Sequence, residues 1–151
     1  MSVRRVMGTE TEYAVSAPGQ GRYNPVQLSF DVVGAASDAS RSHIRWDYRQ
    51  EDPVNDAPQL NITNVIAPNG GRIYVDHAHP EYSAPETTDP FEAVRYDRAG
   101  DLIMRAAAAK ASETTGRKIV LHRNNVDGKG ASWGTHENYM MLRSVPFGLV
   151  T

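Results

Sequence analysis

The chain has 151 residues, a formal net charge of −2 and no cysteine. This length is enough for one domain with a buried core and is short for two. The lack of cysteine excludes disulfides, zinc–thiolate sites and cysteine nucleophiles, and the near-neutral charge gives no electrostatic footprint for nucleic acid. No apolar stretch reaches the length of a membrane span, and the first residues lack the apolar region of a signal peptide. We therefore expect a cytoplasmic protein that binds neither nucleic acid nor a membrane.

Residues 3–16 predict a β-strand, because they are rich in β-branched and aromatic side chains. Glu10 and Glu12 lie two residues apart in this strand, so both carboxylates point to the same face. Two neighbouring carboxylates repel each other, and a divalent cation that prefers hard oxygen ligands, such as Mg²⁺ or Mn²⁺, would relieve the repulsion. The alternative is an ordinary solvated strand face. The pattern alone leaves both interpretations open.

A glycine- and proline-containing turn at residues 17–21 ends this strand, and a short helix is predicted from Pro25 to about residue 36. Asn24 suits the N-cap of that helix and Pro25 its first position. Residues 37–60 then lack periodicity and include Trp46. We predict a mobile insertion loop there, which is either functional or a disordered surface insertion.

Residues 61–66 and 72–76 flank the sequence Asn69-Gly70-Gly71 and predict a β-hairpin. The alternation of the second strand divides its side chains into a polar face and an apolar face. The polar face carries Arg72, Tyr74 and Asp76, and the apolar face carries Ile73 and Val75. We expect the apolar pair to pack in the core.

A long helix is predicted from Pro90, with Asp89 as N-cap and Gly116 after its last turn. Gly100 weakens its middle. Its packing stripe is expected to comprise Phe91, Val94, Leu102, Ile103 and Ala106 to Ala109. Residues 117–126 and 135–142 then predict two strands that pair with each other across a glycine-rich segment. The element order favours an α+β fold with a mainly antiparallel β-sheet and helices packed on one face.

The tract after Asp76 gathers further candidate ligands: His77, His79, Glu81 and Glu86. No zinc-binding helix motif is present, and we expect these histidines to orient carboxylates or to pack rather than to bind metal. Lys129 lies between two glycines without Walker spacing, which favours a plain hairpin loop. His136 could reach a metal or a phosphate, whereas Trp133, Tyr139 and Met140 are expected in the core. Metal-assisted chemistry on carboxylates is the best mechanistic class.

Three tracts in this order resemble a known family: residues 8–13, 72–86 and 124–139. They are similar to the N-terminal part of the Pup deamidase/depupylase family, which belongs with the Pup ligases to the carboxylate-amine ligase superfamily of glutamine synthetase. The resemblance implies that residues 1–151 form the N-terminal part of a single, incomplete glutamine synthetase-like catalytic domain. The apolar end of the chain also suggests a fragment of a longer protein.

Residue by residue, the resemblance implies that Glu10, Tyr74 and Glu81 contact Mg²⁺ and that Arg72 contacts the nucleotide phosphates. It implies that Asp76 is the catalytic carboxylate, acting as a nucleophile or as a base. Glu12 and His136 occupy positions of further metal or phosphate contacts in the superfamily. The expected cofactors are Mg²⁺ and ATP, or ADP with phosphate, and the expected partners are Pup and pupylated proteins.

The implied reaction is hydrolysis of the C-terminal glutamine amide of Pup and of the isopeptide bond between Pup and lysine, linked to the bacterial proteasome pathway. A loop like residues 45–56 is a feature of the deamidases that the ligases lack, although here it is shorter. Two alternatives remain, a Pup–protein ligase of the same family and a nucleotide-binding regulator without turnover.

Overall fold

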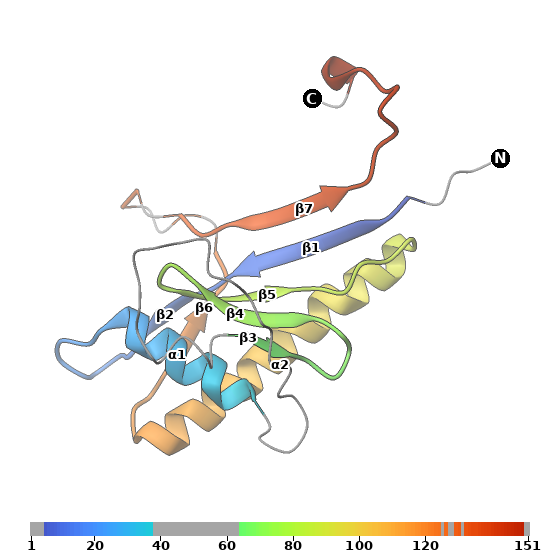
Figure 1. Ribbon diagram of the computed structural model, residues 1–151. Coiled ribbons are helices and arrows are strands. Elements are labelled where there is room, and N and C mark those ends of the chain that lie inside the picture. Colours follow the sequence, from blue (N-terminus) through green and yellow to red (C-terminus); the bar gives the residue numbers. More distant parts are fainter. Residues whose placement is uncertain (1–4, 38–63, 125, 127–128, 131, 150–151) are drawn as a thin grey trace, which may run out of the picture.

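The computed structural model describes residues 5–37, 64–124, 126, 129–130 and 132–149. A mainly antiparallel sheet carries two helices (Figure 1), so the predicted α+β class is confirmed. The predicted insertion loop at 37–60 lies outside the described residues except for Ser37. Within the described ranges, neither helix is long and apolar enough to cross a membrane.

The main sheet has five strands, and each pairs antiparallel with its neighbours. Their spatial order is β3 (Asn64–Ile66), β4 (Arg72–Asp76), β5 (His79–Ser83), β1 (Met7–Glu12) and β7 (Thr135–Tyr139). A separate pair joins β2 (Ala14–Ser16) to β6 (Val120–His122). The strand predicted over residues 3–16 is therefore two strands, divided at Tyr13.

The predicted hairpin before residue 77 is confirmed by the pairing of β3 with β4. The predicted pairing of residues 117–126 with 135–142 is wrong. β6 pairs with β2, and β7 pairs with β1, so consecutive strands of the chain enter different sheets. Within the described part of the segment between β6 and β7, one isolated antiparallel bridge joins Val126 to Ser132. The cause is the division of the first strand into β1 and β2. β2 offers an edge that pairs with β6, and β1 offers an edge that pairs with β7.

Both predicted helices form with the expected caps. α1 spans Pro25–Ala36, and the Asn24 side chain accepts a hydrogen bond from the Val26 amide at 3.0 Å. α2 spans Pro90–Thr115, and the Asp89 side chain accepts one from the Phe91 amide at 2.8 Å. These bonds satisfy amides that the helix itself leaves without partners. α2 ends at Gly116, whose φ of 65° is the left-handed conformation of a C-terminal glycine.

The predicted packing stripe of α2 is confirmed for Ile103, Ala107 and Ala108, which pack in or against the core, and wrong for its other members. Phe91, Val94 and Leu102 are 76%, 61% and 65% exposed. The buried face comprises Gly100, Met104, Ala107, Ala108 and Ala111. Small side chains let the helix axis approach the sheet closely, and at Gly100 the fit leaves no room for a methyl group. A Cβ there would lie 2.3 Å from Cδ1 of the buried Tyr82 ring.

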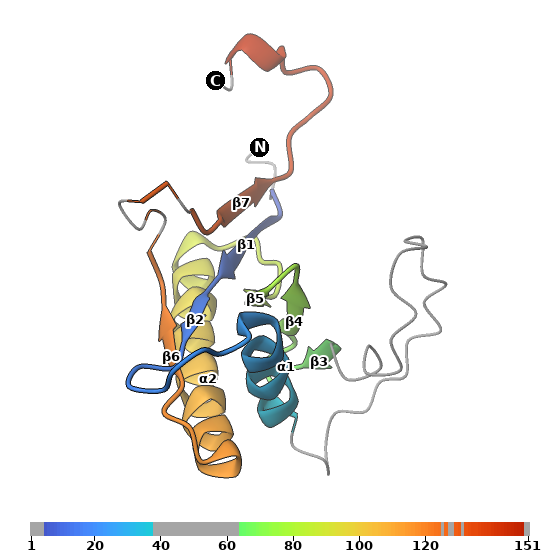
Figure 2. The ribbon, with the colours of Figure 1, turned by 90° about the vertical axis from the view of Figure 1, so that its left-hand side faces the viewer.

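The core lies between the sheet and the two helices, which pack against each other (Figure 2). Tyr82 and Ile73 point from β5 and β4 into this core and are almost completely buried. Because side chains alternate along a strand, their neighbours point to the opposite face, which no helix of the described part covers. The predicted division of β4 into an apolar and a polar face is thus confirmed. The uncovered face, here called the open face, carries the polar side chains.

Candidate metal and nucleotide site

The register of the sheet brings polar side chains of four strands together on the open face. Glu10 on β1 lies opposite Ser83 on β5 and opposite His136 on β7. Glu81 on β5 lies opposite Glu12 on one side and Tyr74 on the other. Residues directly opposite each other in antiparallel strands have Cβ atoms roughly 4.5–5.5 Å apart. Four strands therefore converge on one cluster of carboxylates.

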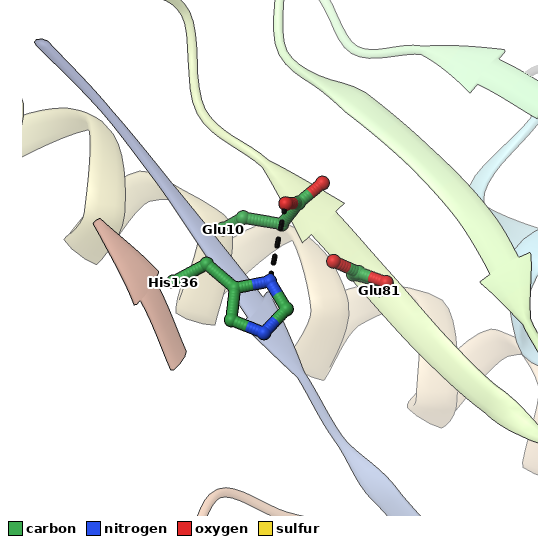
Figure 3. Close-up of side chains that lie close together, drawn as sticks. All are labelled: Glu10, Glu81 and His136. Atoms are coloured by element: carbon green, nitrogen blue, oxygen red, sulfur yellow. Dashed lines mark hydrogen bonds and ion pairs between the residues drawn. The ribbon is translucent and has the colours of Figure 1, made fainter. Parts of the chain in front are cut away.

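Glu10 lies beside His136 and Glu81 in this cluster (Figure 3). Its Oε1 accepts hydrogen bonds from Ser83 Oγ at 2.6 Å and from the Tyr74 hydroxyl. Its Oε2 lies 3.4 Å from Nδ1 of His136. Partial burial favours the neutral carboxyl, but the hydrogen bonds of Ser83 and Tyr74 outweigh it and lower the pKa of Glu10. Glu10 is therefore held as a carboxylate. The same contact and burial raise the pKa of Tyr74, which stays a neutral phenol.

Glu81 is the buried carboxyl of the cluster, with 2% of its surface exposed. Burial and the negative charge of Glu10 raise its pKa to about 7, against the opposing hydrogen bond of Tyr74. Two groups of side chains that could hold a cation share this residue. One is Glu10, Glu81 and His136, and the other is Glu12, Asp76 and Glu81, with ligand atoms within 4.8 Å of one another in each group.

Glu12 is oriented from the opposite side by the segment that precedes β7. The Gly134 amide donates to its Oε2 at 2.8 Å, and His79 Nδ1 lies 3.6 Å from the same oxygen. The His79 ring meets the half-buried Trp133 ring edge to face, with centroids 6.2 Å apart. The predicted orienting role of His79 therefore agrees with its place beside a carboxylate. The space beside Gly134 is taken by the His136 ring, since a Cβ added at Gly134 would lie 2.7 Å from Nε2 of His136.

Arg72 and Asp76 lie at the two ends of β4 on the open face. The Arg72 guanidinium carbon lies 4.2 Å from the centre of the Tyr74 ring, a cation–π contact. Asp76 Oδ1 lies 2.8 Å from Nδ1 of His77, whose φ of 53° is typical of a turn residue. The Asp76 side chain is 43% exposed. Asp76 is therefore the carboxylate of the cluster that an incoming substrate can reach.

An open groove of about 450 Å³ begins at Glu10 and runs along the ends of β1, β5 and β7. Its lining includes Gly8, Glu86, Asn138 and Tyr139. Tyr139 is 59% exposed, and Met140 at the same edge is 61% exposed. The prediction that these two side chains lie in the core is wrong. They lie at the end of the edge strand and just after it, beyond the area that the helices cover.

The sequence predicted seven site residues, and the structure brings all of them to the open face: Glu10, Glu12, Arg72, Tyr74, Asp76, Glu81 and His136. Their roles toward a metal or nucleotide stay predictions. Sequence reasoning missed Ser83 and the Gly134 amide. The alternation of β5 could have found Ser83, which lies two residues after Glu81, but the donor at Gly134 is a backbone group that no residue type signals.

The donor set fits a hard divalent cation. Carboxylate oxygens and one imidazole suit Mg²⁺ or Mn²⁺, and a cation would offset the mutual repulsion of Glu10, Glu12 and Glu81. Exposed carboxylates often cluster without a metal. Here, however, the shared residue Glu81 is buried and its pKa is raised, so the metal-free cluster carries an electrostatic cost that cation binding would remove.

Several known proteins are similar to this chain. "Pup deamidase/depupylase" of Mycolicibacterium smegmatis is 44% identical over 170 residues, which cover 98% of this chain and 34% of that protein. "Depupylase" of Acidothermus cellulolyticus is 45% identical over 96% of this chain and 33% of its own length. "Pup--protein ligase" of Corynebacterium diphtheriae is 36% identical over 94% of this chain and 27% of its own length.

A solved structure supports the same relationship. The crystal structure of the complex between the prokaryotic ubiquitin-like protein Pup and its ligase PafA matches with a TM-score of 0.74 and 28% identity. The match covers 97% of this chain and 27% of that one. The chain thus spans about a third of the length of the curated depupylases it matches. The family described as "Pup-ligase protein" matches residues 5–151, and the chain belongs to this family.

Proposed function

We propose that the protein containing this chain is a Mg²⁺- and ATP-dependent amidohydrolase. It removes the amide of a C-terminal glutamine of Pup and cleaves the isopeptide bond between Pup and lysine. The observation that carries the proposal is the cluster of Glu10, Glu12, Asp76, Glu81 and His136 on the open face, in a chain of the Pup-ligase protein family. The higher identity to depupylases than to ligases favours hydrolysis.

Glu10, Glu81 and His136 would hold one Mg²⁺, with Tyr74 beside them. Glu12 and Asp76 extend the cluster on the other side of Glu81. When bound, Mg²⁺ supplies positive charge that neutralises phosphate oxygens and polarises a carbonyl. Glu10 is already ionised and fixed by two donors, and Glu12 is fixed by the Gly134 amide. The chain therefore presents preorganised carboxylates, which lowers the ordering cost of binding a cation.

The groove beside Glu10 is the site proposed for the nucleotide. Its volume of about 450 Å³ lies in the range of roughly 300–1,000 Å³ typical of small-molecule sites. Glu86, which lines the groove, would repel phosphates, so the phosphates belong at the Glu10 end, near the cation. Arg72 lies in the same row of the sheet, on the other side of Ser83 from Glu10.

Asp76 is the residue proposed to act on the substrate, because it is the accessible carboxylate and lies at the end of β4 away from Arg72. Its carboxylate either attacks the amide carbonyl or takes a proton from an attacking water. In both routes the C–N bond breaks, and the nitrogen leaves as ammonia or as the lysine amine after gaining a proton. In the first route an anhydride between Asp76 and the acyl group remains, and water hydrolyses it to give the free acid and Asp76. In the second route the attacking water supplies the new acid oxygen directly. His77, 2.8 Å from Asp76, can orient the carboxylate.

The test uses the full-length protein, Mg²⁺, ATP and glutamine-ended Pup, followed by mass spectrometry. Deamidation raises the mass of Pup by about one dalton, since an amide becomes an acid. Unchanged glutamine-ended Pup, together with conjugation of glutamate-ended Pup to lysines and net formation of ADP, would support the ligase instead, the function named for the relative that is 36% identical. Binding of ATP and Pup with neither product would support a regulator.

The variant Asp76→Asn should abolish turnover and leave ATP binding unchanged. The matched control is Asp89→Asn, which alters the same chemical group at the N-cap of α2, away from the site. The control variant should keep its activity. Full activity of Asp76→Asn would show that the role of Asp76 is wrong.

A further inference from the structure

Ser83 is the one hydroxyl side chain of β5 on the open face, and it lies between two site residues. In the register of the sheet it is opposite Glu10 on β1 and opposite Arg72 on β4. Its Oγ donates to Oε1 of Glu10 at 2.6 Å, the short distance of a hydrogen bond to an ionised acceptor. The proposed function uses Ser83 only as one of the two donors that fix Glu10, and gives it no part in deciding which oxygen of Glu10 binds the cation.

Tyr74 donates to the same oxygen of Glu10, and its hydroxyl lies 3.3 Å from Ser83 Oγ. A carboxylate oxygen has two lone-pair directions. With both donors in place, Oε1 is saturated. Oε2 remains, and it is the oxygen that faces His136 Nδ1 at 3.4 Å. The two oxygens of Glu10 thus have different surroundings, one occupied by hydroxyl donors and one turned toward the cation group.

We propose that Ser83 is a positioning residue that makes Glu10 bind its divalent cation through Oε2 alone. The inference rests on the cation in the proposed function. The Ser83 hydroxyl fixes the rotation of the carboxylate, so that Oε2 points to the space between Glu81 and His136. The Tyr74 oxygen keeps lone pairs while its hydroxyl donates a hydrogen bond to Glu10, so this bond is compatible with a contact between the Tyr74 oxygen and the cation.

Without the Ser83 donor the carboxylate rotates more freely, and Oε1 competes with Oε2 for the cation. Loss of an outer hydrogen-bond partner of a metal ligand typically weakens metal binding by about 10–100-fold. Because Tyr74 remains as a second donor, we expect the lower end, about tenfold. Threonine keeps the hydroxyl and is well tolerated in strands, so it should restore the contact.

The experiment measures Mn²⁺ binding to the full-length protein by electron paramagnetic resonance of the free ion, without ATP or Pup. Ser83→Ala is expected to raise the Mn²⁺ dissociation constant about tenfold, and Ser83→Thr to keep it within about twofold of the unmodified protein. Ser16→Ala is the matched control. Ser16 is also on a strand and its hydroxyl lies 2.8 Å from His122, but it is outside the cluster. The control should leave Mn²⁺ binding unchanged.

Equal Mn²⁺ affinity of Ser83→Ala and the unmodified protein would overturn the positioning role and leave the proposed cation site intact. No Mn²⁺ binding by the unmodified protein would overturn the inference together with the cation part of the proposed function. If the Pup assay shows no deamidation but the Mn²⁺ affinities of the variants follow the prediction, the proposed reaction is wrong and the positioning role of Ser83 stands. If Ser83→Ala does not fold, Ser83→Cys serves instead, because a thiol is a weak donor, and an unchanged Mn²⁺ affinity would again refute the role.

Discussion

Replacing Gly100 in the middle of α2 by alanine allows a test in which helix propensity and packing predict opposite changes in the free energy of unfolding. On propensity alone, Gly100→Ala should stabilise the helix by about 1 kcal/mol. In the structure, however, the new Cβ would lie 2.3 Å from Cδ1, 2.4 Å from Cε1 and 3.0 Å from Cγ of Tyr82. Ordinary carbon contacts are about 3.5–4.0 Å, so the ring or the helix would have to move by more than about 1 Å.

The Tyr82 ring has little room to retreat. The other edge of the ring packs against Gly71, where an added Cβ would lie 2.7 Å from Cε2. Its hydroxyl accepts a hydrogen bond from Asn69 at 2.8 Å and donates to the Tyr96 carbonyl at 3.2 Å. Overpacking of a well-ordered core costs about 1–3 kcal/mol. After the gain in propensity of about 1 kcal/mol, we expect Gly100→Ala to lower the free energy of unfolding by about 0–2 kcal/mol.

Urea denaturation of the full-length protein measures this change. Ala109→Gly calibrates the propensity term, because Ala109 is exposed on the same helix and its replacement should cost about 1 kcal/mol. The double variant Gly100→Ala with Tyr82→Leu removes the clash and should show a favourable coupling energy. If Gly100→Ala stabilises the protein by the full propensity value, the close packing of Tyr82 on α2 is refuted.

Three further predictions concern charges and caps. In metal-free protein, the raised pKa of Glu81 means that its carboxyl keeps a proton in the folded state at pH values above 4.5, where the unfolded state releases it. The free energy of unfolding should therefore fall between pH 4.5 and about 7, and Glu81→Gln should remove this slope. Arg123→Ala should cost about 1–2 kcal/mol, because Arg123 pairs with Asp97 at 2.7 Å and Asp101 at 2.8 Å with 30% of its side chain exposed. Arg98→Ala removes a 75% exposed partner of the same Asp101 and should lower the free energy of unfolding by less than about 0.5 kcal/mol. If urea denaturation gives equal losses for Arg123→Ala and Arg98→Ala, the explanation by burial is wrong. Asp89→Ala should lose about 1 kcal/mol through the N-cap of α2, and an unchanged midpoint of thermal unfolding would refute that role.

Alternation along single strands was sufficient to predict the faces of the site residues. The period of two placed Glu10 with Glu12, and Arg72 with Tyr74 and Asp76, on common faces that the structure confirms. These predictions need only local backbone geometry. The partner of each strand depends on contacts between distant parts of the chain, so the pairing of β7 with β1 was not predicted.

The α2 helix shows a second limit of sequence reasoning. The predicted stripe included the large apolar residues of the first half of the helix, but the buried face is made of Gly100, Met104 and three alanines, of which only Ala107 and Ala108 were predicted. Close approach to the Tyr82 ring selects small side chains there, and hydrophobicity alone does not report this requirement. Phe91, Val94 and Leu102 consequently lie on the exposed face.

The most direct test of the site is to locate the cation. Crystals of the full-length protein grown with ATP and Mn²⁺ should give an anomalous difference peak on the open face of the sheet. We expect its ligands to include Glu10 Oε2, Glu81 and His136, at about 2.0–2.2 Å. A Mn²⁺ peak away from these side chains, or nucleotide bound with no cation at the cluster, would contradict the proposed site.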